Sequence, residues 1–538
     1  MKCASSIRDD RCRQLVACLV LFVLAAALRL AVIDHQGLWA DELFSLAMAT
    51  GHSLEQPAST AQPELGDYVE ASHPLPATEY KRYLAHQNPP AGPAEVVRAV
   101  RLSDTSPPLY YLLLWMWTRV TGTSDVALRS LSVFWALACF SLFYVLAHEI
   151  GGTAATVPAL VLFTLSPLSL YYSTEGRMYS LLWFLAAGLA WLTLKLNQRG
   201  SRPVVHALWM LVAAAGLLTH YFFAFIVLAC AAWLFIYPGR LNRLSVLAAG
   251  VGVGILIAPW YVHIVESLSS WRVTKDWLLV PSVASRSLAA LTLPWTFVSP
   301  RSPSWPSDAG LEYAAVVLFV ILAILAARTL RRRFFAKRRQ LLWMCLFSAC
   351  AGPFLFDRIM GTYTTAVPRY AIAGMPAALL LTALALGRLR PTVRLVFLVL
   401  IAMVWLPGSW TVVTHSMRSW EPFRQVASVL DAQVLGSDIV VVHSIPSGVL
   451  GIARYLKKPV TLFSWVGQLK ARRVPEDIES LPAWGRLILI KIHTVGEPAP
   501  EEAWLRAHAR LSEHLTMAGA EVLFFVRDDI DPRHRIEP

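Results

Sequence analysis

The strongest constraint on the fold of this chain is a series of about eleven long apolar segments, each near the ~20 residues that a helix needs to cross a bilayer. They lie at residues 15–33, 128–149, 154–172, 177–195, 205–219, 221–238, 244–264, 311–327, 341–356, 370–386 and 393–413. Because lipid offers the backbone no hydrogen bonds, such spans are expected to be helical. We therefore predict a mainly α fold, a polytopic membrane helical bundle with a small C-terminal α/β domain.

The charge of the chain supports this topology. The formal net charge is +13, which in a soluble protein would suggest nucleic acid, yet only 15% of the 538 residues are charged and 56% are hydrophobic. Lys and Arg gather in every second loop, at 195–202, 240–243, 328–339 and 388–394. The positive-inside rule makes these loops and the N-terminus cytoplasmic. We expect a multi-pass protein of the cell inner (plasma) membrane with no nucleic-acid partner.

Two regions outside the spans carry their own patterns. The transmembrane domain is predicted to comprise residues 1–414, with 49–106 as a long first extracytoplasmic loop that contains helices near 77–84 and 94–102. Residues 415–538 are predicted to form an extracytoplasmic α/β domain, because strand and helix patterns alternate there. The expected strands are 439–443, 460–464, 487–493 and 521–527, and the expected helices are 422–434, 448–457 and 501–518.

An adjacent pair of carboxylates, Asp41 and Glu42, follows the first apolar segment. The pair can be a solvated loop, but Trp39 and Phe44 flank it and would partly desolvate it. Desolvation raises the pKa of a carboxylate and makes it a usable general base. Because successive helical residues point about 100° apart, one acid alone can face a given cleft. We predict Asp41 as the catalytic base and Glu42 as a helper or helix-start residue.

A second cluster lies in the short outer loop around residues 171–179. It contains Glu175, Arg177 and Tyr179, together with two further tyrosines. One interpretation is an interfacial tyrosine belt with a local ion pair. The other makes Glu175 a second catalytic carboxylate that supports the base or positions the acceptor, and places Arg177 and Tyr179 in substrate binding.

Arg369 and Tyr370 enter the tenth span from the outside. An arginine at the end of a span is costly unless it is paired or snorkels to the interface, and its planar fork suits a phosphate. His220 and Tyr221 lie in a tight outer hairpin, where the histidine is either an interfacial cap or a substrate contact.

Asp104 and Tyr110 flank a Pro-Pro pair at residues 107–108 and are also candidates for substrate binding. Asp104 can equally be an N-cap for the apolar helix expected at 109–120. In the outer loop 265–310, Arg272 and Lys275 are candidates for a lipid headgroup contact, as they would be in any amphipathic loop.

Four motifs occur in one order along residues 35–385, and together they resemble the GT-C-fold, polyprenyl-phosphate-dependent glycosyltransferases. The motifs are Asp-Glu at 41–42, Pro-Pro-Leu-Tyr-Tyr at 107–111, Tyr-Ser-Thr-Glu-Gly-Arg-Met-Tyr at 172–179 and Arg-Tyr at 369–370. Within this group the chain is similar to the bacterial branch related to protein O-mannosyltransferases and the aminoarabinose transferase of lipid A.

The resemblance implies an enzyme that transfers a sugar, with inversion, from a polyprenyl-phosphate carrier to an acceptor hydroxyl at the extracytoplasmic face. The acceptor would be a glycolipid, a cell-envelope glycan or a protein. Asp41 matches the first-loop acid of the family, Glu175 stands where relatives have a second acid, and Arg369 matches a residue near the lipid phosphate. One departure is Ser106, where many relatives have His or Lys before the Pro-Pro pair. A basic contact is therefore missing or supplied elsewhere, with His73, Lys81 and Arg101 as candidates.

Two questions remain open at the level of sequence. The Asp41–Glu42 pair is a candidate for one divalent cation, but no third oxygen ligand is evident, so no cofactor is certain. The alternative function is a lipid or lipid-linked-sugar flippase, which would favour ionisable residues in mid-span and internal repeats. Arg29 is the clearest charge inside an apolar run, and no repeat is obvious.

Overall fold

The computed structural model describes residues 2–527 except 57, 105, 201, 265–278, 280–284, 302–307, 331–335, 415–420, 467–473, 483, 494–495 and 497–498. The chain forms two compact units. The first, here called the helical unit, comprises Met1–His35, Arg129–Val265 and Asp276–Met417. The second, the mixed unit, comprises Gln36–Leu128, Glu266–Lys275 and Arg418–Pro538. The first long loop is thus grouped with the C-terminal residues, and the predicted boundary between residues 414 and 415 stays a prediction.

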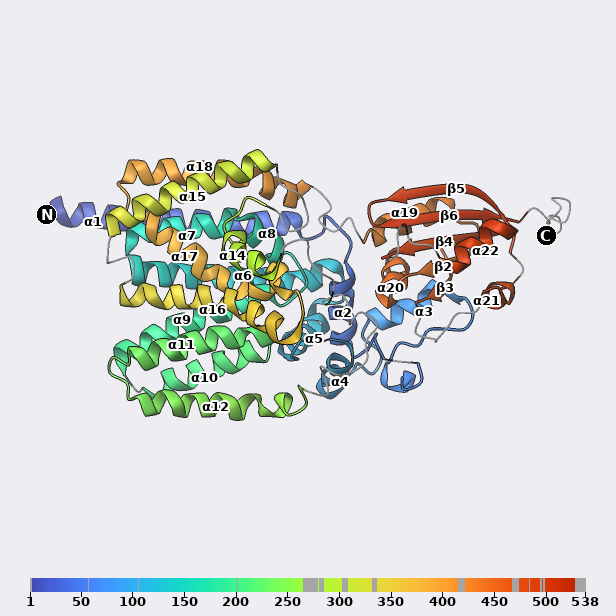
Figure 1. Cartoon of the computed structure of the whole chain (residues 1–538), viewed down its shortest axis with the longest axis horizontal. Coiled ribbons are helices and arrows are strands. Elements are labelled where there is room, and N and C mark those ends of the chain that lie inside the picture. Colours follow the sequence, from blue (N-terminus) through green and yellow to red (C-terminus); the bar gives the residue numbers. More distant parts are fainter. Residues whose placement is uncertain are drawn as a thin grey trace. The chain divides into compact units, whose positions relative to one another are not determined.

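The helical unit consists of α-helices joined by short turns and 3-10 segments (Figure 1). Its elements are α1 (Lys2–Val32), α6 (Asp125–Gly151, whose first turn belongs to the mixed unit), α7 (Thr153–Leu165), α8 (Pro167–Ser173), α9 (Tyr179–Arg199), α10 (Pro203–Leu217), η3 (Tyr221–Phe223), α11 (Ala224–Ile236), α12 (Arg243–Tyr261), α14 (Arg286–Thr296), α15 (Ala309–Leu330), α16 (Lys337–Met360), η6 (Thr364–Ala366), η7 (Pro368–Gly374), α17 (Met375–Leu386) and α18 (Pro391–Thr414).

The predicted membrane character of this unit is confirmed. Among the described residues, eight helices are long and apolar enough to cross a membrane. The pair α7 and α8, bent by 60°, would make a ninth span, and α10 and the segment Tyr221–Ile236 are shorter apolar helices. Each of the eleven predicted segments therefore falls on a candidate span, on the bent pair or on one of the two shorter helices. The chain is a multi-pass membrane protein with a mainly α fold.

The bend between α7 and α8 explains the charge inside the first apolar segment. Pro167 begins α8, so α7 ends before it and leaves carbonyl groups without helical partners. Arg29 is fully buried, and its guanidinium donates to Phe163 O at 3.3 Å and to Ser169 Oγ at 2.9 Å. Arg29 therefore binds both halves of the broken helix. These hydrogen bonds also compensate for burying a charged side chain in a membrane bundle.

The mixed unit contains the remaining elements. They are α2 (Ala40–Ala49), η1 (Pro63–Leu65), β1 (Leu75–Pro76), α3 (Ala77–Lys81), η2 (Arg82–Leu84), α4 (Pro93–Ser103), α5 (Leu109–Thr121), α19 (Phe423–Gln433), β2 (Ile439–His443), α20 (Pro446–Tyr455), β3 (Thr461–Trp465), α21 (Glu476–Glu479), β4 (Arg486–Ile492), α22 (Pro500–His508), β5 (Arg510–Met517) and β6 (Ala520–Val526). The four predicted strands and the predicted helices at 77–84, 94–102, 109–120, 422–434 and 448–457 are present within a few residues.

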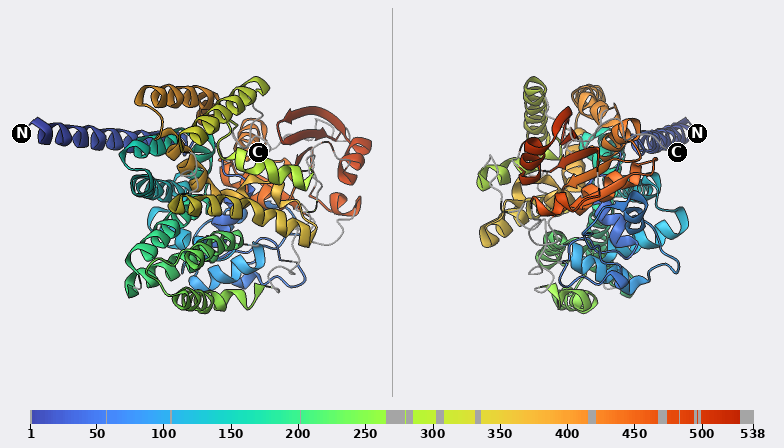
Figure 2. Two further views of the ribbon diagram at one scale, coloured as in Figure 1. Left: turned by 60° about the vertical axis from the view of Figure 1, so that its left-hand side comes forward. Right: turned by 90° about the vertical axis from the view of Figure 1, so that its right-hand side faces the viewer.

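A six-stranded sheet organises the mixed unit, with strand order β1-β3-β2-β4-β6-β5. Figure 1 labels β3, β2, β4, β6 and β5, and Figure 2 shows the sheet from two further sides. Strand β2 lies parallel to both β3 and β4, whereas β1, β5 and β6 pair antiparallel with their neighbours. The chain passes from β2 to β3 on one side and then to β4 on the other. The direction of connection therefore reverses at the carboxyl ends of β2 and β4, the place where open α/β sheets usually bind ligands.

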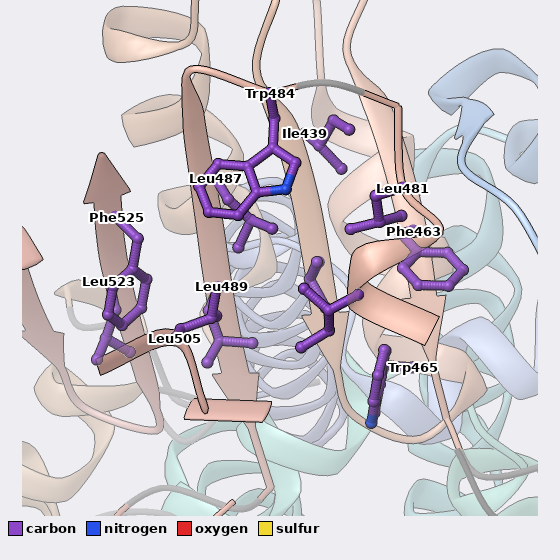
Figure 3. Packing of buried hydrophobic residues seen from close by; sticks show 12 residues of the cluster. Ile439, Phe463, Trp465, Leu481, Trp484, Leu487, Leu489, Leu505, Leu523 and Phe525 are labelled. Atoms are coloured by element: carbon purple, nitrogen blue, oxygen red, sulfur yellow. The ribbon is translucent and has the colours of Figure 1, made fainter. Parts of the chain in front are cut away.

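Both faces of the central strands are buried, because alternate residues point to opposite sides of a sheet. On one face, an apolar cluster joins the strands to α21, α22 and the segment between α21 and β4 (Figure 3). The cluster contains Ile439, Val441, Phe463, Trp465, Ile478, Leu481, Trp484, Leu487, Leu489, Leu505, Leu523 and Phe525. On the other face, Val440, Val442 and Leu462 are fully buried, and α20 packs against β2 and β3.

One predicted helix, Glu501–Ala518, is wrong in its second half. Helix α22 ends at His508, and residues 510–517 form the edge strand β5. The strand pairs with β6 across a turn at Gly519, which has φ +84°. A register shift between Leu511 and Glu513 disturbs the alternation of side chains and hides the period of two that would have marked a strand.

The long loop 49–106 is folded around a buried carboxylate, Asp67. Arg98 donates to both of its oxygens at 2.7 Å, and Ser53 Oγ donates at 2.6 Å. Burial would raise the pKa of Asp67, but these bonds and one from the Gln62 N–H outweigh it and hold the pKa below its usual value. The loop is thereby fastened at several points, as is typical of long loops that serve a function.

Candidate active site

The predicted base lies in the first turn of α2. Asp41 is half-buried, whereas Glu42 is fully buried. Glu42 Oε2 accepts the backbone N–H of Trp39 at 3.3 Å, so its carboxylate closes the start of its own helix. Glu42 therefore caps its own helix, and Asp41 is the acid more accessible to solvent.

Two side chains from the C-terminal part of the mixed unit hold the residues just before Asp41. Tyr455 Oη accepts the N–H of Leu38 at 2.6 Å, and Glu421 Oε2 accepts the N–H of Ala40 at 2.5 Å. Together with Glu42, they take three successive N–H groups at the start of α2. These donors have no helical partner, so side-chain acceptors are required where the segment is buried.

The Tyr455 hydroxyl is itself held by Asp125, to which it donates at 2.6 Å. Arg424 and Arg454 both pair with this carboxylate, each at 2.8 Å, and Asp125 is only 7% exposed. Burial and the nearby Asp125 charge raise the pKa of Tyr455, so its hydroxyl keeps its proton. The local sequence around Asp125, Glu421 and Tyr455 gives no sign of a partner hundreds of residues away. Sequence patterns alone therefore did not mark these residues as part of the site.

Asp104 and Tyr110 lie near the start of α5. Asp104 does not cap this helix, because the N-cap position is Pro108; its carboxylate instead accepts the Ser106 N–H at 2.8 Å and the Tyr111 hydroxyl at 2.5 Å. Tyr110 is fully buried. Helix α5 packs against α2, so the Pro-Pro motif and the Asp-Glu motif are neighbours within the mixed unit.

The helical unit gathers a second set of predicted residues around Tyr172. The charges of Glu175 and Arg369 both act on the hydroxyl of Tyr172, together with Tyr179, whose ring centroid is 4.8 Å from that of Tyr172. Glu175 is 1% exposed. Glu175 and Arg369, nearly 200 positions apart in the sequence, therefore both lie in the neighbourhood of Tyr172.

Of the other predicted residues of the helical unit, His220 lies next to Tyr370. The Tyr370 ring centroid lies 6.0 Å from that of His220 and 5.4 Å from that of Phe222. His220 Nδ1 accepts the Phe222 N–H at 3.2 Å, so this histidine caps the short turn η3. Tyr221 faces α12, where its hydroxyl accepts from Trp260 Nε1 at 3.0 Å.

Arg177 lies in the tight turn after Glu175 and is 7% exposed. The turn is closed by the Arg177 N–H, which donates to Glu175 O at 2.7 Å. Ser132 Oγ on α6 donates to Arg177 O at 3.1 Å and fixes the turn to the bundle.

A saturated carboxylate positions the loop that leads to Arg369. Asp357 is fully buried near the end of α16 and accepts from Thr362 Oγ1 at 2.6 Å and from the N–H of Thr364 at 2.7 Å. Thr365 donates both its N–H, at 2.8 Å, and its hydroxyl. The segment 362–365 is thus wrapped around one anion, which determines where the chain enters η7.

Several candidates lie apart from these groups. The Lys81 ammonium donates to Leu456 O at 2.8 Å, and His73 is exposed. Arg272 and Lys275 lie outside the described residues. Within the part of the chain that the structure describes, no group of three or more His, Cys, Asp or Glu side chains is arranged to hold a metal ion.

Comparison with solved structures identifies the architecture. The chain matches ArnT from Cupriavidus metallidurans in the apo state with a TM-score of 0.55 and 11% identity, over 94% of this chain and 97% of that one. It matches the same ArnT bound to undecaprenyl phosphate with a TM-score of 0.52 and 13% identity, over the same shares. The chain has the GT-C fold.

A family model agrees with this fold. Residues 105–263 match the family described as dolichyl-phosphate-mannose-protein mannosyltransferase. No curated protein matches the chain. The family segment and the GT-C fold both agree with the predicted class of the protein, a membrane glycosyltransferase. The segment contains the Pro-Pro motif and the 172–179 motif on which the resemblance was based.

Proposed function

We propose that this GT-C protein is an inverting glycosyltransferase that moves a sugar from a polyprenyl-phosphate carrier to an acceptor hydroxyl. The observation that carries the proposal is the match over 94% of the chain to an ArnT structure bound to undecaprenyl phosphate. The family segment, named for a dolichyl-phosphate-mannose donor, supports the same class of carrier. The acceptor is a glycolipid, a cell-envelope glycan or a protein.

Asp41 is the proposed general base. It is half-buried at the first turn of a helix whose start is held by side chains, so the backbone that carries its carboxylate is fixed. A positioned base contributes typically 10²–10⁴-fold to such a reaction. Glu42 supports it by closing the turn, since one of its oxygens accepts the Trp39 N–H.

The proposed reaction is a single displacement. The acceptor oxygen attacks the anomeric carbon from the face opposite the phosphate, and the carbon–oxygen bond to the phosphate breaks. The acceptor proton passes to Asp41, and the carrier leaves as a polyprenyl phosphate. The configuration at the anomeric carbon inverts, and no oxidant or metal is required for the balance of atoms and charge.

Arg369 is the proposed phosphate contact, and Glu175 the proposed acceptor contact. Arginine suits a phosphate because its planar fork donates two parallel hydrogen bonds. Tyr370, His220, Tyr221, Tyr179 and Arg177 of the helical unit complete the proposed substrate-binding set. Tyr110 on α5 and Asp104 just after α4 are also proposed to contact the substrate.

The basic loops support an orientation in the inner (plasma) membrane with the N-terminus in the cytoplasm. The motif residues and the C-terminal domain are then extracytoplasmic. A carrier-linked donor fits this face, because its prenyl chain keeps the sugar at the membrane surface.

The test uses purified full-length protein in nanodiscs with undecaprenyl-phosphate mannose, glucose, galactose and 4-amino-4-deoxyarabinose, and an envelope extract as acceptor. We expect release of undecaprenyl phosphate with one donor, and a loss of at least 100-fold in Asp41→Asn. Glu64→Gln, which changes an exposed acid of the same unit, is the matched control and should retain activity. Full transfer by Asp41→Asn would overturn the assignment of the base. Carrier movement across the bilayer without any sugar transfer would instead support the flippase.

A further inference from the structure

The sheet of the mixed unit has an edge where open α/β sheets usually bind a ligand. The reversal of connections lies between the carboxyl ends of β2 and β4. Ser444 directly follows β2 and His493 directly follows β4, and Ser444 Oγ lies 3.1 Å from His493 Nδ1. Two polar side chains thus meet at this point.

These two residues lead to the segment that carries Asp41. His493 Nε2 contacts Glu421 Oε1 at 2.9 Å, and the other oxygen of Glu421 accepts the Ala40 N–H at 2.5 Å. Ser444 is 6% exposed and Glu421 is 9% exposed. A continuous chain of hydrogen bonds therefore runs from the ligand edge of the sheet to the residue before Asp41.

The backbone of His493 supports a specific role. Its φ is +69°, in the left-handed region, and it is the one described non-glycine residue with a positive φ. A non-glycine backbone in this region is strained, and it persists where surrounding contacts determine it. At His493, those contacts are the bonds to Ser444 and Glu421.

A second connection acts on Leu38. Tyr455, the last residue of α20, accepts the Leu38 N–H and donates to Asp125, as described above. Gly37 allows the close approach, because a Cβ there would lie 3.0 Å from Arg424 Cβ and 3.2 Å from the Tyr455 ring. The chain before Asp41 therefore packs directly on α19 and α20.

We propose that the C-terminal α/β domain positions the catalytic segment, and that Glu421, His493 and Tyr455 are positioning residues for Asp41. The ligand edge of the sheet holds the start of α2, a part of the same chain, in place of a separate small molecule. This inference rests on the proposed function, since it assigns the base to Asp41. On this proposal the C-terminal domain affects kcat and does not bind the acceptor.

The same three side-chain types, Ser, His and an acid, also occur in acyl-transfer centres. Two observations favour positioning here. The Ser444 side chain is buried, so a substrate has little access to its hydroxyl. Glu421 does more than orient the histidine, because its second oxygen binds the Ala40 N–H.

The first test measures backbone hydrogen–deuterium exchange of a peptide covering residues 36–44 in the full-length protein in nanodiscs. Tyr455→Phe removes the acceptor for Leu38, and Glu421→Ala removes the acceptor for Ala40. We expect each to raise exchange of this peptide at least tenfold, whereas Glu421→Gln, whose amide oxygen can still accept, should have a smaller effect. Tyr80→Phe is the matched control, because it removes a buried hydroxyl that donates to Leu462 O.

The second test measures kcat and KM of the same variants with the donor that the wild type uses. Positioning predicts that Tyr455→Phe, Glu421→Ala and His493→Ala lower kcat at least tenfold, with KM for the donor unchanged within about twofold. Glu421→Gln should restore part of kcat. An effect on KM for the acceptor alone would overturn the proposal in favour of acceptor binding.

Hydrogen–deuterium exchange and the kinetic constants together distinguish a failure of the positioning proposal from a failure of the proposed function. Unchanged exchange in Tyr455→Phe and Glu421→Ala would overturn the positioning proposal, and so would raised exchange with unchanged kcat. If the wild type transferred no sugar from any donor, the proposed function would fail and the catalytic role with it. The exchange data would still decide whether the C-terminal domain holds residues 38–40.

Discussion

Glu421 Oε2 accepts the backbone N–H of Ala40 at 2.5 Å, although the two residues are 381 positions apart in the sequence. The carboxylate that accepts this bond lies near the start of the C-terminal domain, and the N–H belongs to the first residue of α2. The start of α2 therefore depends on a residue from the C-terminal part of the chain.

Glu42 is predicted to be structural. Replacing it with Ala leaves the Trp39 N–H without its acceptor in a fully buried site, which costs about 1–3 kcal/mol. We expect a lower thermal midpoint and faster exchange at 36–44. Glu42→Gln should keep most of the stability and most of the activity, because the amide oxygen can accept the same bond. A loss of transfer in Glu42→Gln as large as that in Asp41→Asn would assign the base to Glu42.

Arg369 is predicted to bind the phosphate of the donor. Arg369→Ala should raise KM for the donor about tenfold to hundredfold, which corresponds to about 1.5–3 kcal/mol for charge-assisted hydrogen bonds. Arg369→Lys should recover part of this loss, because lysine keeps the charge but not the planar fork. Inhibition by free undecaprenyl phosphate should weaken in parallel. Arg358→Ala, an exposed arginine at the end of α16, is the control, and an equal effect there would point to surface charge.

The long loop is predicted to loosen in mild acid because of His52. Burial, followed by the charges of Arg82 and His86, lowers the pKa of His52 from 6.5 to about 4. A folded-state pKa below the unfolded one means that stability is complete above pH 6.5 and is lost as the pH falls toward 4, by up to about 3 kcal/mol. Proteolysis between residues 49 and 66 should therefore increase from pH 7 to pH 4.5. His52→Gln should remove this dependence, and an unchanged profile in that variant would assign it to other groups.

Asp357 is predicted to be irreplaceable by Asn. Its two oxygens accept five bonds from Thr362, Thr364 and Thr365, and an amide nitrogen would face donors at one of the two positions. We expect a loss of about 2–4 kcal/mol and faster exchange at residues 361–367. Asp308→Asn, which changes an exposed acid, is the control for the thermal midpoint. A midpoint for Asp357→Asn equal to that of the control would show that the loop does not depend on this anion.

Sequence patterns predicted most of the fold because the relevant signals are local. The length of each apolar run is sufficient to predict a span, and runs of branched residues such as 439–443 are sufficient to predict buried strands. The prediction failed at residues 510–517, where a bulged edge strand lacks clear alternation. The two-residue strand β1 has no local signal at all, because it is defined only by its pairing with β3.

The residues of the candidate site also fall into two groups, those that local sequence marks and those that only the folded chain reveals. Asp41, Glu175 and Arg369 could be proposed from the sequence because charged residues stand out beside apolar spans, and their roles stay predictions. The neighbours that restrain them could not be proposed in this way. Asp125 and Asp357 are acids at helix ends, and only the folded chain shows that one takes two arginines and the other takes three threonines.

By itself the sequence determined that this protein crosses a membrane many times, carries an α/β domain at its C-terminus and places a pair of acids just after the first span. Those features depend on hydrophobicity and period over stretches of 5–25 residues. Only the tertiary structure decided that Tyr455 and Glu421 hold the backbone before Asp41. Hydrogen bonds between distant segments depend on three-dimensional position, and no short stretch of sequence encodes it.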